Sequence, residues 1–253
     1  MSTDQPGAPS KPLHSMFISV PRHYDLVNTI ITWGLDKGWR ARAARECLKS
    51  QPGKLLDLCC GTGDLVITIA RLAEHDIELT GVDYSQPMLD IARQKAELLA
   101  RGKKISFVLG AAAELPFTDG YFDCVGISFA FRNLTYKNPL MQRHLSEVFR
   151  VLKCGGRFVI VESSQPKSRL IRALFHLYLR WFTFRVGYMV SGNRQAYHYL
   201  AESAARFFTP EEITDMLLKT GFRQVSYQPF FGGAAGIHVA VKQPSKLTPI
   251  TKY

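Results

Sequence analysis

The sequence predicts an α/β fold, a doubly wound sheet of seven strands with a helical insertion near its C-terminal end. From Lys54 onward, strand-like and helix-like segments alternate, which indicates a parallel sheet covered by helices on both faces. The last two strand-like segments have no helix between them, which predicts an antiparallel edge. A glycine loop, "CCGTGD", follows the first strand, at the end of the sheet where open α/β sheets bind ligands.

Each element has its own local pattern. Seven short apolar segments bounded by turn-forming residues are predicted strands: 54–60, 77–83, 105–110, 121–131, 156–163, 222–230 and 234–242. Four segments with helical spacing of apolar residues are predicted helices: 65–73, 86–100, 138–152 and 209–221. Pro87 stands in the first turn of the second helix, where proline is favoured. Thr209 and Glu212 form a capping box that predicts where the last helix begins.

Length and composition favour one domain. The chain has 253 residues, of which 46% are apolar, and we expect a single domain over 16–242 with an insertion at about 165–205. The segments 1–15 and 243–253 have the composition of flexible tails. The first dozen residues lack an apolar core, and no run is long and apolar enough to span a bilayer. Together these features predict a cytoplasmic protein.

The five cysteines predict neither disulfides nor a metal centre. Their number is odd and two are adjacent, Cys59 and Cys60, which favours reduced thiols in a cytosol-like compartment. No Cys or His pair with ligand spacing accompanies them, so we expect them to pack within the loop. The net charge of +11 favours an anionic partner, whether nucleic acid, acidic lipid or an anionic ligand.

The glycine loop predicts a site for an adenosine-containing cofactor. Gly61 and Gly63 let the backbone approach a ligand closely, and Asp83 ends the second strand twenty positions after Gly63, where a carboxylate can accept both ribose hydroxyls. A dinucleotide fingerprint needs a third glycine, where this chain has Val66. Asp57, in front of the loop, suits a cation better than a pyrophosphate. A tight turn without a ligand is the alternative interpretation of the loop alone.

Longer segments resemble known enzymes. "ELPFTDGYFDCVGISFAFRN" (114–133) and "EVFRVLKCGGRFVIVE" (147–162) resemble class I S-adenosylmethionine-dependent methyltransferases, which have a Rossmann-like fold. "HYDLVNTIITWGLDKGWR" (23–40), "SFAFRNL" (128–134) and "YHYLAESAARFFTPEEITDML" (197–217), followed by "GGAAGIHVAVK", resemble more narrowly the ubiquinone/menaquinone biosynthesis C-methyltransferase family. This resemblance runs from about Met16 to Lys242. It implies methyl transfer from S-adenosylmethionine to a ring carbon of a reduced polyprenyl benzoquinol or naphthoquinol.

The resemblance and the loop together specify the expected cofactor site. The expected cofactor-binding residues are Asp57, Gly61, Thr62, Gly63, Asp83, Tyr84, Ala111, Ala112 and Ser128. Position 111 in the family is usually Asp or Asn, which can hold the adenine amino group. Alanine there predicts either weaker binding, by about 1 kcal/mol for one lost hydrogen bond, or a contact made by backbone groups or by Glu114.

The expected catalytic residues are Arg132, Asn133 and Tyr24. Arg132 would stabilise the oxyanion of the substrate phenolate or hold a water that takes its proton, and Asn133 would hydrogen-bond a ring oxygen. Tyr24 would contact substrate or cofactor from an N-terminal segment that closes over the site. The alternatives are that Arg132 pairs with an acidic residue and that Tyr24 and Asn28 pack or cap a helix.

The insertion carries two stripes at helical spacing. One is apolar: Leu170, Leu174, Leu177, Trp181 and Phe184. The other is mostly basic: Arg169, Arg172, His176 and Arg180. Such a helix either lies on an anionic membrane, where a polyprenyl substrate resides, or is a lid whose apolar face covers the core. The chain is expected to form a homodimer or to join a biosynthetic complex.

Two other functions stay open. A methyltransferase of this fold can act on another hydrophobic small molecule, such as a sterol or a polyketide. Ala111 and the basic charge also permit a non-catalytic relict of the fold, acting as a scaffold or nucleic-acid binder. The intact "GTGD" and Asp83 argue against the relict, and no RNA-reading module is recognisable, so no nucleic-acid partner is expected.

Overall fold

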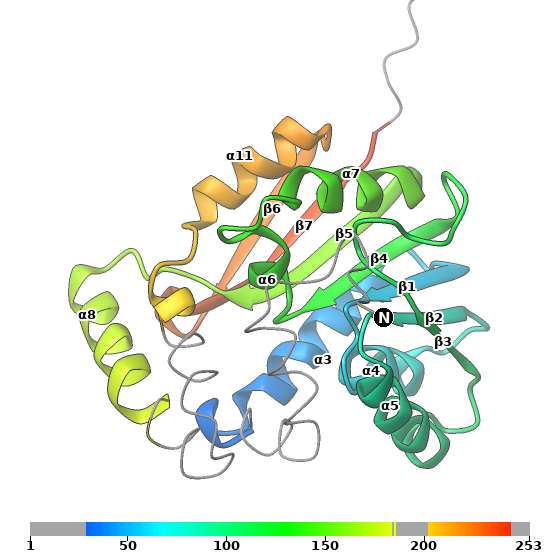
Figure 1. Cartoon of the computed structure of the whole chain (residues 1–253), viewed down its shortest axis with the longest axis horizontal. Coiled ribbons are helices and arrows are strands. Elements are labelled where there is room, and N and C mark those ends of the chain that lie inside the picture. Colours follow the sequence, from blue (N-terminus) through cyan, green and yellow to red (C-terminus); the bar gives the residue numbers. More distant parts are fainter. Residues whose placement is uncertain (1–28, 184, 186–201, 244–253) are drawn as a thin grey trace, which may run out of the picture.

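The computed structural model describes residues 29–183, 185 and 202–243, which form one seven-stranded sheet with helices on both faces (Figure 1). The strands run in the order β3-β2-β1-β4-β5-β7-β6. Their bounds are β1 Lys54–Leu58, β2 Glu78–Asp83, β3 Ile105–Leu109, β4 Phe122–Ser128, β5 Leu152–Ser163, β6 Gln224–Phe230 and β7 Ala235–Val241. Strands β1 to β5 pair in parallel, whereas β7 pairs antiparallel with both β5 and β6. The doubly wound sheet and its antiparallel edge are therefore confirmed.

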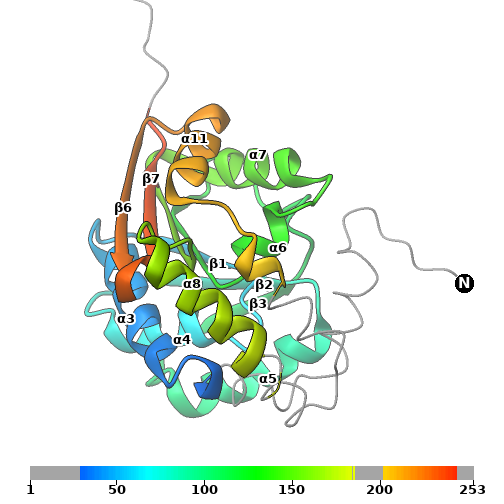
Figure 2. The ribbon, with the colours of Figure 1, turned by 90° about the vertical axis from the view of Figure 1, so that its left-hand side faces the viewer.

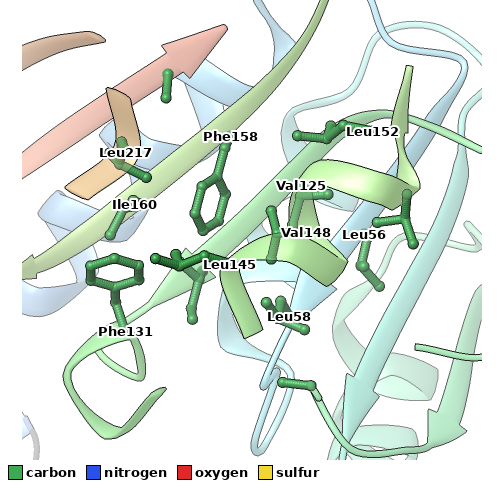
Figure 3. Close-up of a cluster of buried hydrophobic side chains, with 14 of the residues drawn as sticks. Leu56, Leu58, Val125, Phe131, Leu145, Val148, Leu152, Phe158, Ile160 and Leu217 are labelled. Atoms are coloured by element: carbon green, nitrogen blue, oxygen red, sulfur yellow. The ribbon is translucent and has the colours of Figure 1, made fainter. Parts of the chain in front are cut away.

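The helices divide between the two faces. Their bounds are α3 Leu35–Leu48, α4 Asp64–Leu72, α5 Gln86–Leu99, α6 Phe131–Thr135, α7 Met141–Val151, α8 Arg169–Tyr178 and α11 Pro210–Thr220. One buried cluster joins the sheet to α6, α7 and α11, and Figure 3 shows Leu56, Val125, Leu145, Phe158 and Leu217 within it. A second cluster joins the opposite face to α3 and α4. Burial on both faces explains why the central strands are continuously apolar.

Two strand boundaries differ from the sequence-based prediction by three residues or more. The strand predicted over 121–131 ends at Ser128, because Phe129 has a positive φ of 55° that takes the backbone out of the ladder. Phe131 then begins the short helix α6 and is fully buried. The strand predicted from Gly156 begins at Leu152, directly after α7. Gly156 allows this tight junction, since a Cβ there would lie 2.8 Å from the Lys153 carbonyl oxygen.

The last helix begins as predicted. The Thr209 hydroxyl accepts a hydrogen bond from the Glu212 amide, and the Glu212 carboxylate accepts one from the Thr209 amide, which confirms the capping box. The sequence analysis missed α3, whose small residues Ala43, Ala44 and Cys47 are fully buried against the sheet. Its polar composition hides this helix from a search for apolar stripes.

Helix α8 lies on the outside of the molecule (Figure 2). Ser168 caps its N-terminus, and a short π-helix, Leu179–Thr183, continues it. No residue within Arg169–Tyr178 is buried, and Leu170, Leu174 and Leu177 are each more than half exposed. Arg172 and His176 instead face the protein, where they hydrogen-bond the Pro166 carbonyl and the Gln165 side chain. The apolar stripe of α8 therefore does not cover the core, and Phe184 lies outside the described residues.

Candidate active site

A pocket lies at the carboxyl ends of β1, β2 and β4, where the loops after β1 to β4 meet. Its lining includes these predicted site residues: Asp57, Gly61, Thr62, Asp83, Tyr84, Ala111, Ala112, Ser128 and Asn133. Gly63 stands at the N-terminus of α4, and Arg132 lies outside the lining. Tyr24 and Asn28 lie outside the described residues. Asp57 and Asn133 are 76 positions apart in the sequence. The parallel strands bring them to one pocket because the carboxyl ends of these strands share one edge of the sheet.

The glycine loop after β1 is held by its own backbone and by β2. The Gly63 amide donates to the Cys60 carbonyl at 2.8 Å, and the Cys60 amide donates to the Val82 carbonyl at 2.9 Å. Gly61 and Gly63 both have positive φ, 53° and 82°, which glycine adopts without strain. The Cys60 sulfur packs against Gly81, where an added Cβ would lie 3.0 Å from it. Burial raises the pKa of the Cys60 thiol, which keeps it protonated.

Asp83 links the glycine loop to the end of β2. One carboxylate oxygen accepts from the Gly61 amide and the other from the Ser85 amide, both at 2.9 Å. The side chain is buried, and burial raises its pKa above the ordinary value, although these amides oppose the shift. The Tyr84 amide also opposes the shift, and since a carboxylate has about four lone-pair sites, Asp83 keeps the capacity to accept a further hydrogen bond. A ribose hydroxyl of a bound cofactor is a suitable donor.

Asp57 is a buried carboxyl at the end of β1. It is 1% exposed and accepts a hydrogen bond from the Val66 amide at 3.0 Å. The pKa of Asp57 is raised to about 8, chiefly by burial and also by the nearby carboxylates of Asp83 and Asp64, while the Val66 amide and Arg40 oppose the shift. A positive charge brought into the pocket would lower this pKa and favour the carboxylate. The site is thus suited to a cationic ligand.

The sequence analysis missed several residues of this pocket. Arg40 on α3 pairs with Asp36 at 2.5 Å and with Asp64 at 3.3 Å, and Lys95 also pairs with Asp64. Other lining residues that were missed include Phe129, Asn138 and His144. Arg40 partly balances the three pocket carboxylates, which explains how they lie together. Asp64 is the last residue of the "GTGD" motif, so its place in the pocket could have been predicted from the sequence. Nothing in the local sequence indicates that Arg40 pairs with Asp64.

The two adjacent residues of α6 have different surroundings. Asn133 lines the pocket, and its carbonyl accepts a hydrogen bond from the Asn138 side chain at 2.9 Å. The Arg132 side chain is 7% exposed, and its Nη1 lies 3.1 Å from the Ser163 hydroxyl and 3.8 Å from the Glu162 carboxylate. The Arg132 amide also donates to Glu162. Arg132 thus pairs with an acidic residue of β5, which is the alternative to direct contact with the substrate.

The pocket contains polar atoms that suit a ligand. The Ser128 hydroxyl is buried and has no hydrogen-bond partner among residues 29–183 and 202–243. A buried hydroxyl of this kind is normally satisfied, so a bound molecule with an acceptor group fits there. Together, Ser128, Asp83 and Asp57 match a ligand that carries hydroxyls and a positive charge. The described residues contain no group of three or more His, Cys, Asp or Glu side chains able to hold a metal ion.

Comparison with known proteins identifies the family. The family model described as the ubiE/COQ5 methyltransferase family matches residues 6–242. A demethylmenaquinone methyltransferase from Deinococcus radiodurans is 41% identical over 91% of this chain and 92% of its own length. A protein of the same name from Thermotoga maritima is 38% identical over 92% of this chain and 97% of its own.

Solved structures agree on the fold. A SAM-dependent methyltransferase from Aquifex aeolicus superposes with a TM-score of 0.53 at 16% identity, over 75% of this chain and 81% of that one. Another from Thermotoga maritima superposes with a TM-score of 0.55 at 22% identity, over 88% and 98%. These structures confirm the predicted class I methyltransferase fold. With the family model matching almost the whole chain, the protein belongs to the ubiE/COQ5 methyltransferase family.

Proposed function

We propose that this protein transfers the methyl group of S-adenosylmethionine to a ring carbon of a demethylmenaquinol. The observation that carries the proposal is the pairing of Asp57 and Asp83 in one pocket, on a chain 34–41% identical to demethylmenaquinone methyltransferases. S-adenosylmethionine would supply an electrophilic methyl group bound to a positively charged sulfur. The cofactor is accommodated by Asp83 at its ribose, by Asp57 near its positive charge and by Ser128 at a polar group.

The substrate side of the reaction requires a phenolate. A quinol hydroxyl loses its proton, the adjacent ring carbon forms a bond to the methyl group, and the carbon–sulfur bond breaks, leaving a neutral thioether. The methylated carbon then loses its proton and the ring oxygen takes one up, which restores the quinol, so that one proton is released overall. In the proposed site Asn133 donates a hydrogen bond to a ring oxygen, and Arg132 holds α6 in place through Glu162 and Ser163. A direct contact between Tyr24 and the substrate stays a prediction.

The proposed reaction is tested by anaerobic incubation with S-adenosylmethionine and reduced demethylmenaquinone, followed by mass spectrometry of the quinone. We expect a product heavier by one methyl group, reduced strongly in Asn133→Ala while S-adenosylhomocysteine binding is retained. Thr135→Val is the matched control for disturbance of α6, because the Thr135 hydroxyl donates to the Phe131 carbonyl within this helix and Thr135 lies outside the pocket lining. Activity on a benzoquinol but not on the naphthoquinol would identify the substrate as a benzoquinol in place of demethylmenaquinol. Failure with both, with cofactor binding intact, would reject a quinol substrate.

The substrate also suggests where the protein works. We expect α8 to contact an anionic membrane, because Leu170, Leu174 and Leu177 are exposed beside the exposed cations Arg169 and Arg180. No helix in the described part of the chain is long and apolar enough to cross a membrane. The proposed arrangement is a cytoplasmic protein on the inner membrane face. A homodimer or a biosynthetic complex stays a prediction, for which light scattering of the purified protein is the test.

Substitution of the apolar stripe tests the membrane contact. We expect the double variant Leu174→Asp/Leu177→Asp to lose vesicle binding by more than about tenfold, since burying each leucine contributes about 1.5–3 kcal/mol. Charge reversal at Arg169 and Arg180 should weaken binding to vesicles with anionic lipid only. Leu98→Asp is the matched control, because Leu98 is 84% exposed on α5. Co-sedimentation with vesicles measures the effect. Equal binding of wild type and all variants would contradict the proposed contact between α8 and the membrane.

A further inference from the structure

The N-terminal half of α7 lies against the loop between β3 and β4. The Arg143 Nε donates to the Ala113 carbonyl at 2.7 Å, and the Leu115 amide donates to the Glu147 carboxylate at 2.7 Å. His144 precedes Glu147 by three positions, so the two side chains share a face of the helix. His144 is buried and lines the pocket together with Ala111 and Ala112. The helix thus presents an imidazole to the pocket beside this loop.

The hydrogen bond of His144 defines which ring nitrogen is an acceptor. Its Nδ1 lies 2.9 Å from the Leu134 carbonyl oxygen, and because a carbonyl only accepts, Nδ1 carries the proton. Burial, and secondarily the charge of Arg143, lower the pKa of His144 below its ordinary value, so the ring is neutral at neutral pH. The Nε2 atom of this tautomer is therefore a lone-pair acceptor. Within residues 29–183 and 202–243 no protein group donates to it.

The loop beside His144 has no side-chain acceptor at positions 111–113, and the Glu114 carboxylate that follows is three-quarters exposed and pairs with Arg143 at 3.4 Å. The Gly110 amide donates to the Asp83 backbone carbonyl at 3.0 Å, so this loop begins directly beside the carboxylate proposed to hold the ribose. Residues 111–113 are all alanine and offer no polar side-chain atom. The amino group of adenine is a hydrogen-bond donor that costs free energy if it is buried without an acceptor.

We propose that Nε2 of His144 accepts a hydrogen bond from the exocyclic amino group of adenine, and so supplies the acceptor that Ala111 lacks. The inference rests on the proposed function, since it assigns one contact of the same cofactor. His144 is then a specificity-determining residue for the base. The competing role for the same nitrogen is to take a proton from the quinol hydroxyl. If His144 contacts adenine, the binding of S-adenosylhomocysteine in the absence of a quinol should depend on His144. If His144 only takes the quinol proton, that binding should not depend on it.

The test compares two ligands that differ at one edge of the purine, where the 6-amino group is replaced by a carbonyl and N1 gains a proton. S-inosylhomocysteine carries a carbonyl oxygen where S-adenosylhomocysteine carries the amine, so it would place two acceptors face to face at Nε2. Calorimetry should show wild-type protein binding S-adenosylhomocysteine about tenfold or more tightly than the inosine analogue. His144→Leu should bind S-adenosylhomocysteine about tenfold more weakly and the analogue almost unchanged. The analogue thus serves as an internal control for folding.

Two rescue variants sharpen the result. His144→Gln keeps an acceptor and should retain part of the preference for adenine. Ala111→Asp in the His144→Leu background should restore it, because the new carboxylate would stand in the same loop. A ¹⁵N spectrum of wild-type protein should also show the Nε2 resonance of His144 shifting with S-adenosylhomocysteine but not with the inosine analogue, which requires no variant.

Three outcomes overturn the inference. Equal wild-type affinity for both ligands would exclude the amino contact. Unchanged discrimination in His144→Leu, together with a lower kcat for methyl transfer, would assign His144 to proton transfer instead. Absence of S-adenosylhomocysteine binding in the wild-type protein would contradict the proposed function itself, which separates that failure from the failure of this contact.

Discussion

Binding of S-adenosylmethionine at pH 7 should release about 0.9 proton per protein, and Asp57→Asn should abolish that release. With a pKa of about 8, Asp57 is about nine-tenths protonated at pH 7 before the ligand binds. A positively charged ligand in the pocket stabilises the carboxylate and so displaces this proton. Calorimetry in buffers of different ionisation enthalpy measures the release. Because the variant binds the same ligand, protons contributed by the ligand itself cancel in the comparison.

The same residue predicts the pH dependence of affinity. Below about pH 8 wild-type affinity should rise with pH, since less work is needed to remove the Asp57 proton, and above it the affinity should level off. Asp57→Asn should bind roughly 10–100-fold more weakly than wild type above pH 8, as expected for loss of one charge-assisted contact. At pH 6 the two proteins should differ less. Parallel pH profiles for both proteins would show that Asp57 does not face the positive charge.

Without ligand, Asp57 should lower the stability of the protein at high pH. Its pKa is higher in the folded state than the ordinary 3.8, so the folded protein binds this proton more tightly than the unfolded chain. The stabilisation from the protonated carboxyl is complete below about pH 4 and is lost as pH rises through about 8. Asp57→Asn should therefore gain more free energy of unfolding relative to wild type at pH 8 than at pH 5. Urea denaturation at both pH values measures this, and an equal difference at both would contradict the shifted pKa.

Arg132→Ala should destabilise the protein by about 3–5 kcal/mol, because it leaves the Glu162 carboxylate buried without its cation. Glu162 and Arg132 are both almost fully buried, and Glu162 also accepts from the Ser163 amide and hydroxyl. The double variant Arg132→Met/Glu162→Gln removes both charges and should recover most of the lost stability. Urea denaturation measures the two differences. A cost below about 1 kcal/mol for Arg132→Ala would show that the pair contributes little to folding.

The double variant also separates two roles for Arg132. If Arg132 only holds α6 against β5, Arg132→Met/Glu162→Gln should restore methyl transfer along with stability. If the guanidinium contacts the reacting ring, as the sequence analysis expects, the stable double variant should bind S-adenosylhomocysteine normally yet stay inactive. The structure favours the first result, because Nη1 is engaged by Ser163 and the side chain lies outside the pocket lining.

The parts of the fold that were predictable depend on local patterns. Continuous apolar strands, the glycine loop and the Thr209–Glu212 cap each have a short sequence signature, and the structure has all of them. The end of β4 was not predictable, because "ISFAF" is apolar apart from Ser128 and the turn depends on the backbone at Phe129. Helix α3 was missed because small buried residues replace an apolar stripe.

The limits at the site have a similar cause. Residues next to the glycine loop and at strand ends were predictable, since parallel topology alone brings Asp57, Asp83 and Ser128 together. The partners of Arg132 and His144, and the Asp64 partner of Arg40, come from elements that meet only in the folded chain. The sequence around a histidine does not show whether its side chain is buried or which ring nitrogen carries the proton. For His144, only the contact of Nδ1 with the Leu134 carbonyl shows that Nε2 is the acceptor.

The central claim is methyl transfer to carbon, and the position of a labelled methyl group tests it most directly. The protein would be incubated anaerobically with S-adenosylmethionine carrying a ¹³C-methyl group and with reduced demethylmenaquinone, and the product examined by ¹³C NMR after reoxidation. The account predicts that the label appears as a methyl group bonded to the quinone ring and survives reoxidation. A methoxy resonance, or label that never leaves the cofactor although S-adenosylmethionine binds, would contradict it.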